Sequence, residues 1–300
     1  MTHFALVGPT GSGKSSLALG VARTFGDVEI VSVDSMQVYR GMDVGTAKAT
    51  PAERAEVPHH LLDLAEPDER FTVARFQAEA DKVIAEIEGR GHRALLVGGT
   101  GLYLQAVVDR LAVPGEWPDV RSELDAEAAA TGTEGLHRQL TLVDPKAAAR
   151  IEPSNRRRVV RALEVTLGSG RPFSSFGPGI DAYPSTPFRM TGVWLPRAVL
   201  GRRIDARLRA QVDAGFVEEA TALAPRMSAT ARQALGYKEL LEHVAGDCTL
   251  DEALTAAGRR TRAFSRRQRM WFRRDPRITW LGTGQDPLAL LPALLGNWST

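Results

Sequence analysis

The sequence has very few residues that could form a cross-link or a metal cluster. It contains one cysteine, Cys248, among 300 residues. A single thiol excludes an internal disulfide framework and a zinc cluster built on cysteines. The six histidines are scattered along the chain, so we expect no structural metal.

The chain also lacks a long apolar run. Its longest uncharged stretch, residues 94–108, is too short and too rich in glycine to span a bilayer. The N-terminus has no basic segment followed by an apolar one, so we expect no secretory signal and a cytoplasmic location. With 43% hydrophobic residues, the chain is typical of a globular protein with one large α/β domain or two smaller ones.

The net charge is small, +2 from 38 basic and 36 acidic residues, and by itself indicates no polyanionic partner. The arginines nevertheless gather in three runs: NRRRVVR (155–161), GRRIDARLR (201–209) and GRRTRAFSRRQRMWFRR (258–274). One such run is usually a solvated helix face. Three runs, one of them with interleaved Phe264, Trp271 and Phe272, favour a surface that binds a polyanion such as nucleic acid.

A phosphate-binding motif stands near the N-terminus, in FALVGPTGSGKSSLAL. It fits G-x-x-x-x-G-K-[ST], between an apolar run of strand length (4–7) and a helical stretch (16–22). At such a turn, backbone N–H groups and a helix N-terminus face an anion. Lys14 should reach the outer phosphates, and Ser15 should bind Mg²⁺. The predicted phosphate-binding residues are Gly8, Pro9, Thr10, Gly11, Ser12, Gly13, Lys14 and Ser15. The motif leaves the phosphate donor open, and a nucleoside triphosphate such as ATP is the default.

The pattern of apolar residues predicts an α/β fold. We expect strands at residues 29–34, around Leu62, and at 93–99, 189–195 and 277–282, with a helix within 71–91. Residues 111–190 show helical stretches and no confident strand, and they include a Gly/Pro/Ser-rich connection at 168–187. The sequence therefore predicts a P-loop-type parallel sheet core (1–112 and 191–300) interrupted by a helical insert domain (113–190).

Asp34 closes the second predicted strand and should lie beside the phosphate loop, because ligands bind beyond the carboxyl ends of parallel strands. Its carboxylate could bind Mg²⁺, as in a Walker B motif, or act as a general base. The polar loop that follows, DSMQVYRGMDVGTAK, suits a second substrate. The strand at 93–99 leads into a glycine-rich turn around Thr100 that contains no acid. The chain has no N-K-x-D motif and no second convincing apolar run that ends in aspartate.

The motifs GPTGSGKS, DSMQVYRGMDVGTAK, VGGTGLY, RRVVRALEV and ARQALGYKEL occur in this order and at family-typical spacing. In this the chain resembles the bacterial tRNA dimethylallyltransferases (IPP transferase family) over residues 4–280. The resemblance implies transfer of a dimethylallyl group from dimethylallyl diphosphate to the exocyclic N6 of the adenine 3′-adjacent to the anticodon, with release of diphosphate. The phosphates at the loop would then belong to an allylic diphosphate. The implied partners are tRNA and the diphosphate, with Mg²⁺ as cofactor and a monomeric enzyme.

The resemblance also implies roles for individual residues. Asp34 would be the catalytic base, Asp34, Ser35, Met36 and Gln37 would lie at the target adenine, Thr100 and Arg121 would contact RNA, and Arg203 would contact the diphosphate. The target base would be flipped out of its stack.

Two groups of arginines are predicted to contact the tRNA. In relatives the insert motif reads roughly Gln-Arg-x-x-Arg; here Arg158 and Arg161 are kept and Arg157 replaces the amide. A phosphate contact from Arg157 is therefore expected rather than a base-specific one. In the C-terminal run, Arg262, Arg266, Arg269 and Arg273 share one helix face and are predicted to follow the phosphates of the anticodon stem.

Other functions fit parts of the sequence. A small-molecule kinase would use the phosphate loop but would need no basic insert and no arginine-rich C-terminal helix. A nucleic-acid-binding NTPase or adaptor would use the arginines but would need no polar loop after Asp34. An adenylate isopentenyltransferase would accept a free nucleotide, and the basic insert argues against it.

Overall fold

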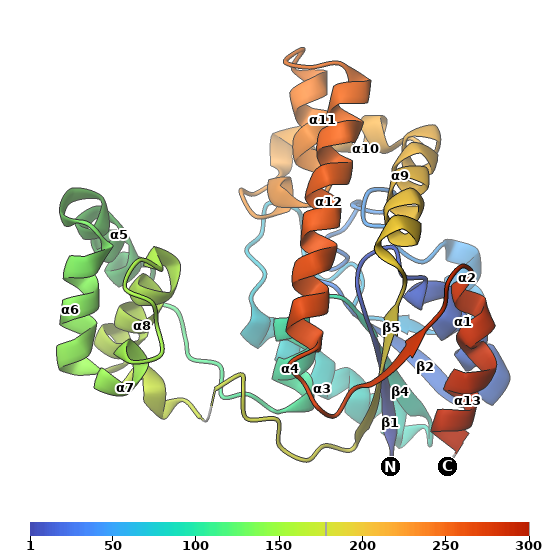
Figure 1. The fold of residues 1–300 in the computed structure, drawn as a ribbon, viewed down its shortest axis with the longest axis horizontal. Coiled ribbons are helices and arrows are strands. Elements are labelled where there is room, and N and C mark those ends of the chain that lie inside the picture. Colours follow the sequence, from blue (N-terminus) through green and yellow to red (C-terminus); the bar gives the residue numbers. More distant parts are fainter. Residues whose placement is uncertain (178, 300) are drawn as a thin grey trace. The chain divides into compact units, whose positions relative to one another are not determined.

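A computed structural model of the protein describes residues 1–177 and 179–299 (Figure 1). The chain folds as two compact units, one formed by Met1–Asp109 with Tyr183–Thr300 and the other by Arg110–Ala182. The second unit thus ends before residue 190, the limit expected from the sequence. The reason is that the end of the connection belongs to the first unit, where Thr186 donates a hydrogen bond to the carbonyl of Val108 (3.2 Å).

The first unit is built on a six-stranded, all-parallel sheet in the order β3-β2-β4-β1-β5-β6. The strands are β1 (His3–Val7), β2 (Val28–Val33), β3 (His59–His60), β4 (Arg93–Gly98), β5 (Phe188–Trp194) and β6 (Thr279–Gly282). Strands β1 and β2 are buried along their whole length. In β1 the residues from Phe4 to Val7 are all apolar, as expected for a strand covered on both faces, whereas β2 also buries Glu29 and Ser32. The predicted P-loop-type α/β fold is confirmed.

One predicted strand is wrong. The segment around Leu62 is not a strand, and β3 covers only His59–His60. Leu61 and Asp63 have φ values of 61° and 57°, a left-handed conformation that no strand residue adopts. The alternation of apolar and polar residues here instead marks a turn that brings Asp63 to a buried lysine of the neighbouring loop.

Helices cover both faces of the sheet, and the alternation of side chains along β1 explains which face each one covers. Phe4 and Leu6 pack against α1 (Lys14–Phe25) and α13 (Leu291–Ser299). Ala5 and Val7 point to the other face, which is covered by α3 (Val73–Gly89) and α4 (Gly101–Val108). The remaining helices of this unit are α2 (Pro51–Glu56), α9 (Arg197–Asp213), α10 (Phe216–Leu223), α11 (Tyr237–Val244) and α12 (Leu250–Phe272).

The second unit is helical, as predicted, with a core of its own. Its elements are α5 (Pro118–Thr131), α6 (Thr133–Val143), α7 (Pro145–Ala148), α8 (Arg156–Ser169) and the 3-10 turn η1 (Phe173–Ser175). Leu136, Leu140 and Leu163 are buried between these helices. Among residues 1–177 and 179–299, no helix combines the length and apolarity that a bilayer crossing requires.

A buried carboxylate ties the amino end of β2 to its neighbours. Glu29 is only 3% exposed and accepts hydrogen bonds from Arg90 (2.9 and 2.8 Å), His60 (2.6 Å) and His92 (2.9 Å). Burial opposes the charge, but these hydrogen bonds outweigh it and lower the pKa of Glu29 from 4.5 to about 2. The carboxylate therefore stabilises the fold in its charged form.

We expect Glu29→Gln to lower the free energy of unfolding at pH 7 by about 3 kcal/mol, because the buried side chain loses its charge-assisted hydrogen bonds from Arg90. A depressed carboxyl pKa contributes stability above its unfolded value near 4.5 and loses it as pH falls toward 2. The difference from wild type should therefore shrink between pH 4.5 and pH 2. Urea unfolding over this range measures it. Glu86→Gln, at a solvent-exposed glutamate of α3, is the control and should change stability little.

Candidate active site

The phosphate loop forms a turn between β1 and α1 that only glycines allow. Gly11 and Gly13 have φ values of 86° and 85°. A Cβ on Gly8 would lie 2.5 Å from the carbonyl oxygen of Val193, so that position also has no room for a side chain. Helix α1 begins at Lys14, and its first N–H groups face the turn. The side chain of Lys14 donates to the carbonyl of Pro9 (2.9 Å).

Asp34 follows directly on β2, as predicted, and lies at the same edge of the sheet as this loop. Val33 and Gly98 are register partners, so the ends of β2 and β4 lie side by side. The N–H of Met36 donates to Oδ1 of Asp34 (2.8 Å), and the N–H of Ser35 donates to the hydroxyl of Thr100 (3.2 Å). The hydrogen bond between Ser35 and Thr100 thus joins the turn after β2 to the turn after β4.

Two cavities of the first unit meet at Asp34. The larger, about 640 Å³, is lined by the phosphate loop, including Lys14 and Ser15. The smaller, about 280 Å³, is lined by Ser35, Met36 and Thr100 and by residues of the C-terminal third of the chain. The cavities share four residues: Thr10, Asp34, Thr46 and Arg207. A group bound in one cavity can therefore meet a group bound in the other at the Asp34 carboxylate.

The larger cavity is cationic around the phosphate loop, where Lys14, Arg203 and Arg207 line it. Desolvation lowers the pKa of Lys14 to about 8, against the opposing effect of Asp34, and Arg207 lowers it further. Arg203, predicted as a diphosphate contact, lines the cavity, and its Nε donates to the carbonyl of Gly11 (2.9 Å). This concentration of positive charge suits a polyphosphate.

Arg207 is a site residue that the sequence interpretation missed. It lines both cavities, and burial lowers its pKa against the attraction of Asp34. Within the part of the chain that the structure describes, its buried Nε finds no hydrogen-bond acceptor. The signal was present in the sequence, because Arg207 lies four residues after Arg203 and therefore on the same face of α9.

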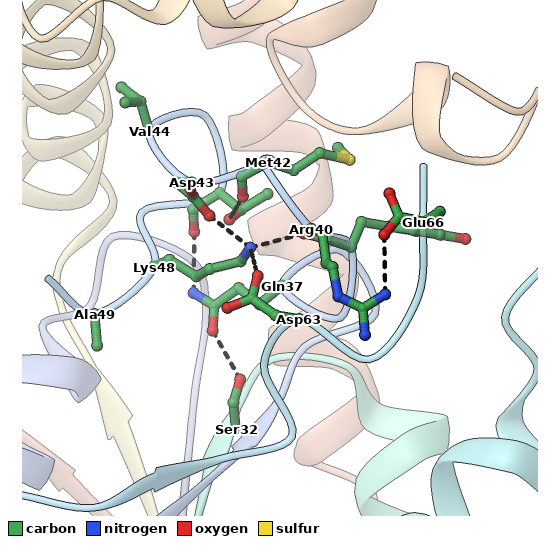
Figure 2. A network of polar contacts seen from close by, with 12 residues as sticks. Ser32, Gln37, Arg40, Met42, Asp43, Val44, Lys48, Ala49, Asp63 and Glu66 are labelled. Atoms are coloured by element: carbon green, nitrogen blue, oxygen red, sulfur yellow. Dashed lines mark hydrogen bonds and ion pairs between the residues drawn. The ribbon is translucent and has the colours of Figure 1, made fainter. Parts of the chain in front are cut away.

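The loop after Asp34 is held by its own polar side chains (Figure 2). The Gln37 amide accepts from the hydroxyl of Ser32 (2.7 Å) and donates to the carbonyls of Thr46 and Ala47 (3.1 and 3.2 Å). Gln37, predicted to lie at the adenine, lines the larger cavity but not the smaller one. Its polar atoms shape the loop in this structure.

Lys48 is the centre of the same loop. Its side chain is 1% exposed, and Nζ donates to the carbonyl of Tyr39 (2.7 Å) and to the carboxylates of Asp43 and Asp63 (both 2.6 Å). An ammonium group has three protons, so all its donors are used. Lys48 is thus a structural cross-link between Tyr39, Asp43 and Asp63.

The structure brings two predicted RNA contacts together inside the insert. Arg121 and Arg161 both form ion pairs with Glu164, whose side chain is 1% exposed (3.1 and 2.9 Å). Arg161 also donates to the carbonyls of Pro114 and Gly115 (3.0 and 2.9 Å). Both arginines therefore stabilise the insert, whereas Arg157 and Arg158 are exposed at the start of α8.

The predicted arginine face of α12 divides in a similar way. Arg262 forms an ion pair with Asp205 of α9. Arg266 is exposed, and the guanidinium of Arg269 lies over the ring of Trp194 (5.5 Å). Arg267, absent from the predicted set, lines the smaller cavity. The free cationic surface of this helix lies mainly in its second half.

Two family models match this chain: one described as IPP transferase over residues 37–275, and one described as isopentenyl transferase over residues 1–67. The chain belongs to the IPP transferase family. The model described as IPP transferase alone covers most of the first unit and the whole second unit. The resemblance seen in the motifs is therefore confirmed.

Members of the IPP transferase family with similar sequences cover nearly the whole chain. The tRNA dimethylallyltransferase of Kineococcus radiotolerans is 48% identical over 97% of this chain and 94% of its own. That of Bifidobacterium adolescentis is 44% identical over 98% of this chain and 86% of its own.

Solved structures of the family agree with the fold. A tRNA isopentenylpyrophosphate transferase from Bacillus halodurans has a TM-score of 0.69 and 39% identity, covering 99% of this chain and 97% of its own. A eukaryotic dimethylallyltransferase acting on tRNA has a TM-score of 0.77 and 25% identity, covering 99% of this chain and 75% of its own.

Proposed function

We propose that this chain transfers a dimethylallyl group from dimethylallyl diphosphate to N6 of the adenine 3′-adjacent to the anticodon of tRNA. The observation that carries the proposal is the meeting of two cavities at Asp34, one with a phosphate loop and one with arginines and an aromatic side chain. Family membership supports the reaction class. Both cavities are lined by one chain, so we propose a monomeric enzyme, working in the cytoplasm where tRNA is available.

In this proposal the larger cavity holds the donor. The backbone N–H groups of the phosphate loop, with Lys14, Arg203 and Arg207, bind the diphosphate and stabilise the charge that develops as the allylic C–O bond breaks. The hydroxyl of Ser15 borders the same cavity and would be an oxygen ligand for Mg²⁺, an ion that usually takes its other ligands from water and substrate phosphates. Bound Mg²⁺ would neutralise charge on the leaving diphosphate.

The smaller cavity holds the acceptor adenine. As N6 bonds to the allylic carbon and diphosphate leaves, the Asp34 carboxylate takes the proton that N6 loses. The backbone hydrogen bond from Met36 orients the carboxylate for this transfer. Phe264, Arg260 and Arg267 line the cavity and offer a ring and guanidinium groups on which a flipped base can stack.

One assay separates the proposal from its rivals. Purified protein is incubated with labelled dimethylallyl diphosphate and either unmodified tRNA or AMP, and ATP turnover is followed in parallel. We expect label to enter tRNA only. Label in AMP would indicate an adenylate isopentenyltransferase. Steady ATP hydrolysis, with no label transferred, would indicate a kinase or NTPase.

We propose that the second half of α12 and the start of α8, with exposed Arg157 and Arg158, contact tRNA phosphates. Each phosphate contact adds about 0.7 to 0.9 to the log–log salt slope of binding. Arg266→Ala with Arg269→Ala should therefore weaken tRNA binding and reduce that slope by about 1 to 2, with diphosphate binding unchanged. Filter binding across a salt series measures it.

The chain offers a matched control for this experiment. Arg262→Ala removes an arginine of the same helix whose charge Asp205 already neutralises, so the salt slope should stay as in the wild type. An unchanged slope in the double variant would leave the phosphate contacts to the insert alone.

A further inference from the structure

A buried glutamine of the basic helix α12 joins the two loops that flank Asp34. Gln268 is 6% exposed. Its Oε1 accepts from the backbone N–H of Thr10 in the phosphate loop (2.8 Å), and its Nε2 donates to the carbonyl of Gly99 in the turn after β4 (3.0 Å). The side-chain amide of Gln268 thus links two backbone segments, each more than a hundred and fifty residues before it in the sequence.

Residues one turn before and one turn after Gln268 in α12 contact the same loops. Three residues before Gln268, the buried hydroxyl of Ser265 donates to the carbonyl of Thr10 (3.2 Å). Three residues after it, Trp271 packs so closely on Gly101 that a Cβ there would lie 2.2 Å from the indole. This stripe of α12 lies at spacing i, i+3, i+6 and therefore faces one way, toward the loops.

Gln268 packs tightly against Gly99. A Cβ on Gly99 would lie 2.1 Å from Nε2 of Gln268, so the glycine is required for the amide to reach its carbonyl. An apolar side chain in place of the amide would remove the partners of the half-buried N–H of Thr10 and of the buried carbonyl of Gly99. Thr10 borders both cavities, so its position affects donor and acceptor alike.

We propose that Gln268 is a positioning residue that sets the separation between the phosphate loop and the turn after β4, and so presents the loop in its diphosphate-binding form. The inference rests on the proposed function for its donor, dimethylallyl diphosphate. Both hydrogen bonds of the Gln268 amide go to backbone groups, so its effect on the reaction passes through Thr10 and Gly99. Helix α12 then has two separate functions: its exposed arginines contact tRNA, and its opposite, buried face positions the phosphate loop.

The test compares Gln268→Met, which keeps the side-chain length but neither hydrogen bond, with the wild type. Calorimetry with inorganic diphosphate and Mg²⁺ should show an affinity about tenfold or more lower, the scale of a buried polar group left unpaired. The KM for dimethylallyl diphosphate should rise by a similar factor, whereas tRNA affinity should stay within about twofold. Gln139→Met, the same change at an exposed glutamine of the insert, is the control and should alter none of these values.

A second variant adds a readout that a general loss of packing would not give. In Gln268→Glu the introduced carboxyl can donate to Gly99 and accept from Thr10 only when it is protonated. Its diphosphate affinity relative to the wild type should therefore rise as pH is lowered from 8 to 5. This measurement also serves if the methionine variant does not fold.

Two results would overturn the proposal: a folded Gln268→Met variant that binds diphosphate within twofold of the wild type, or a glutamate variant with a flat pH profile. Loss of tRNA affinity in parallel with diphosphate affinity would also overturn it, because the whole helix would then have moved. Failure of the proposed function appears separately, as wild-type protein that binds magnesium diphosphate but transfers no prenyl group to tRNA.

Discussion

Asp34→Asn should lower the single-turnover rate of prenyl transfer by about 10² or more, the scale of general-base catalysis. The asparagine keeps the shape of the side chain and an oxygen that can accept from the N–H of Met36, so the turn after β2 should be preserved. It cannot take the proton that N6 loses. Affinities for tRNA and for magnesium diphosphate should change little, and rapid-quench kinetics with both substrates saturating measures the chemical step.

The same variant separates the two roles that the sequence left open for Asp34. If the carboxylate bound Mg²⁺, high Mg²⁺ concentrations should restore part of the rate, because the remaining ligands would still hold the ion. A general base gives no such rescue. Asp68→Asn, at an exposed aspartate, controls for the loss of one negative charge and should react at the wild-type rate. A wild-type rate in Asp34→Asn would remove the residue from the chemistry altogether.

Much of the fold could be predicted because its signals are local. A strand buried on both faces is expected to be largely apolar, and β1 from Phe4 and β4 from Ala94 are continuous apolar runs. The glycines of the phosphate loop mark a backbone that other residues cannot adopt. The segment around Leu62 has a strand-like pattern as well, but there the turn is decided by a contact between Asp63 and Lys48, which no local pattern contains.

The candidate site was harder to predict, because a charge in the sequence does not reveal its partner. Arg161 and Arg262 look like free cations in their runs, yet they pair with Glu164 and Asp205 at other places in the chain. Gln268 stands within a run of arginines, and nothing nearby marks it as buried. Such assignments depend on which helix faces pack together, and that is a property of the tertiary fold.

The second large effect is expected at Lys14. Lys14→Ala should lower turnover by about 10² to 10³, the cost of removing one preorganised donor to a charge that develops in the transition state. Its ammonium group, which binds the carbonyl of Pro9 in this structure, would hold the leaving diphosphate. Donor affinity should fall as well, because the lysine also attracts the ground-state diphosphate. Steady-state kinetics with labelled donor separates the two effects, and Lys82→Ala, at an exposed lysine of α3, is the control.

The pH dependence of diphosphate binding gives an independent test of Lys14. Desolvation lowers its pKa to about 8, so the side chain is cationic below that pH and neutral above it. An anion binds better to the cationic form, and affinity for magnesium diphosphate should therefore fall as pH rises through 8 toward 9.5. In Lys14→Arg the charge persists across this range, so the alkaline loss should disappear even if the overall affinity is lower. A wild-type profile that stays flat to pH 9.5 would show that Lys14 does not bind the diphosphate through its charge, and the arginines of α9 would then have to hold the leaving group.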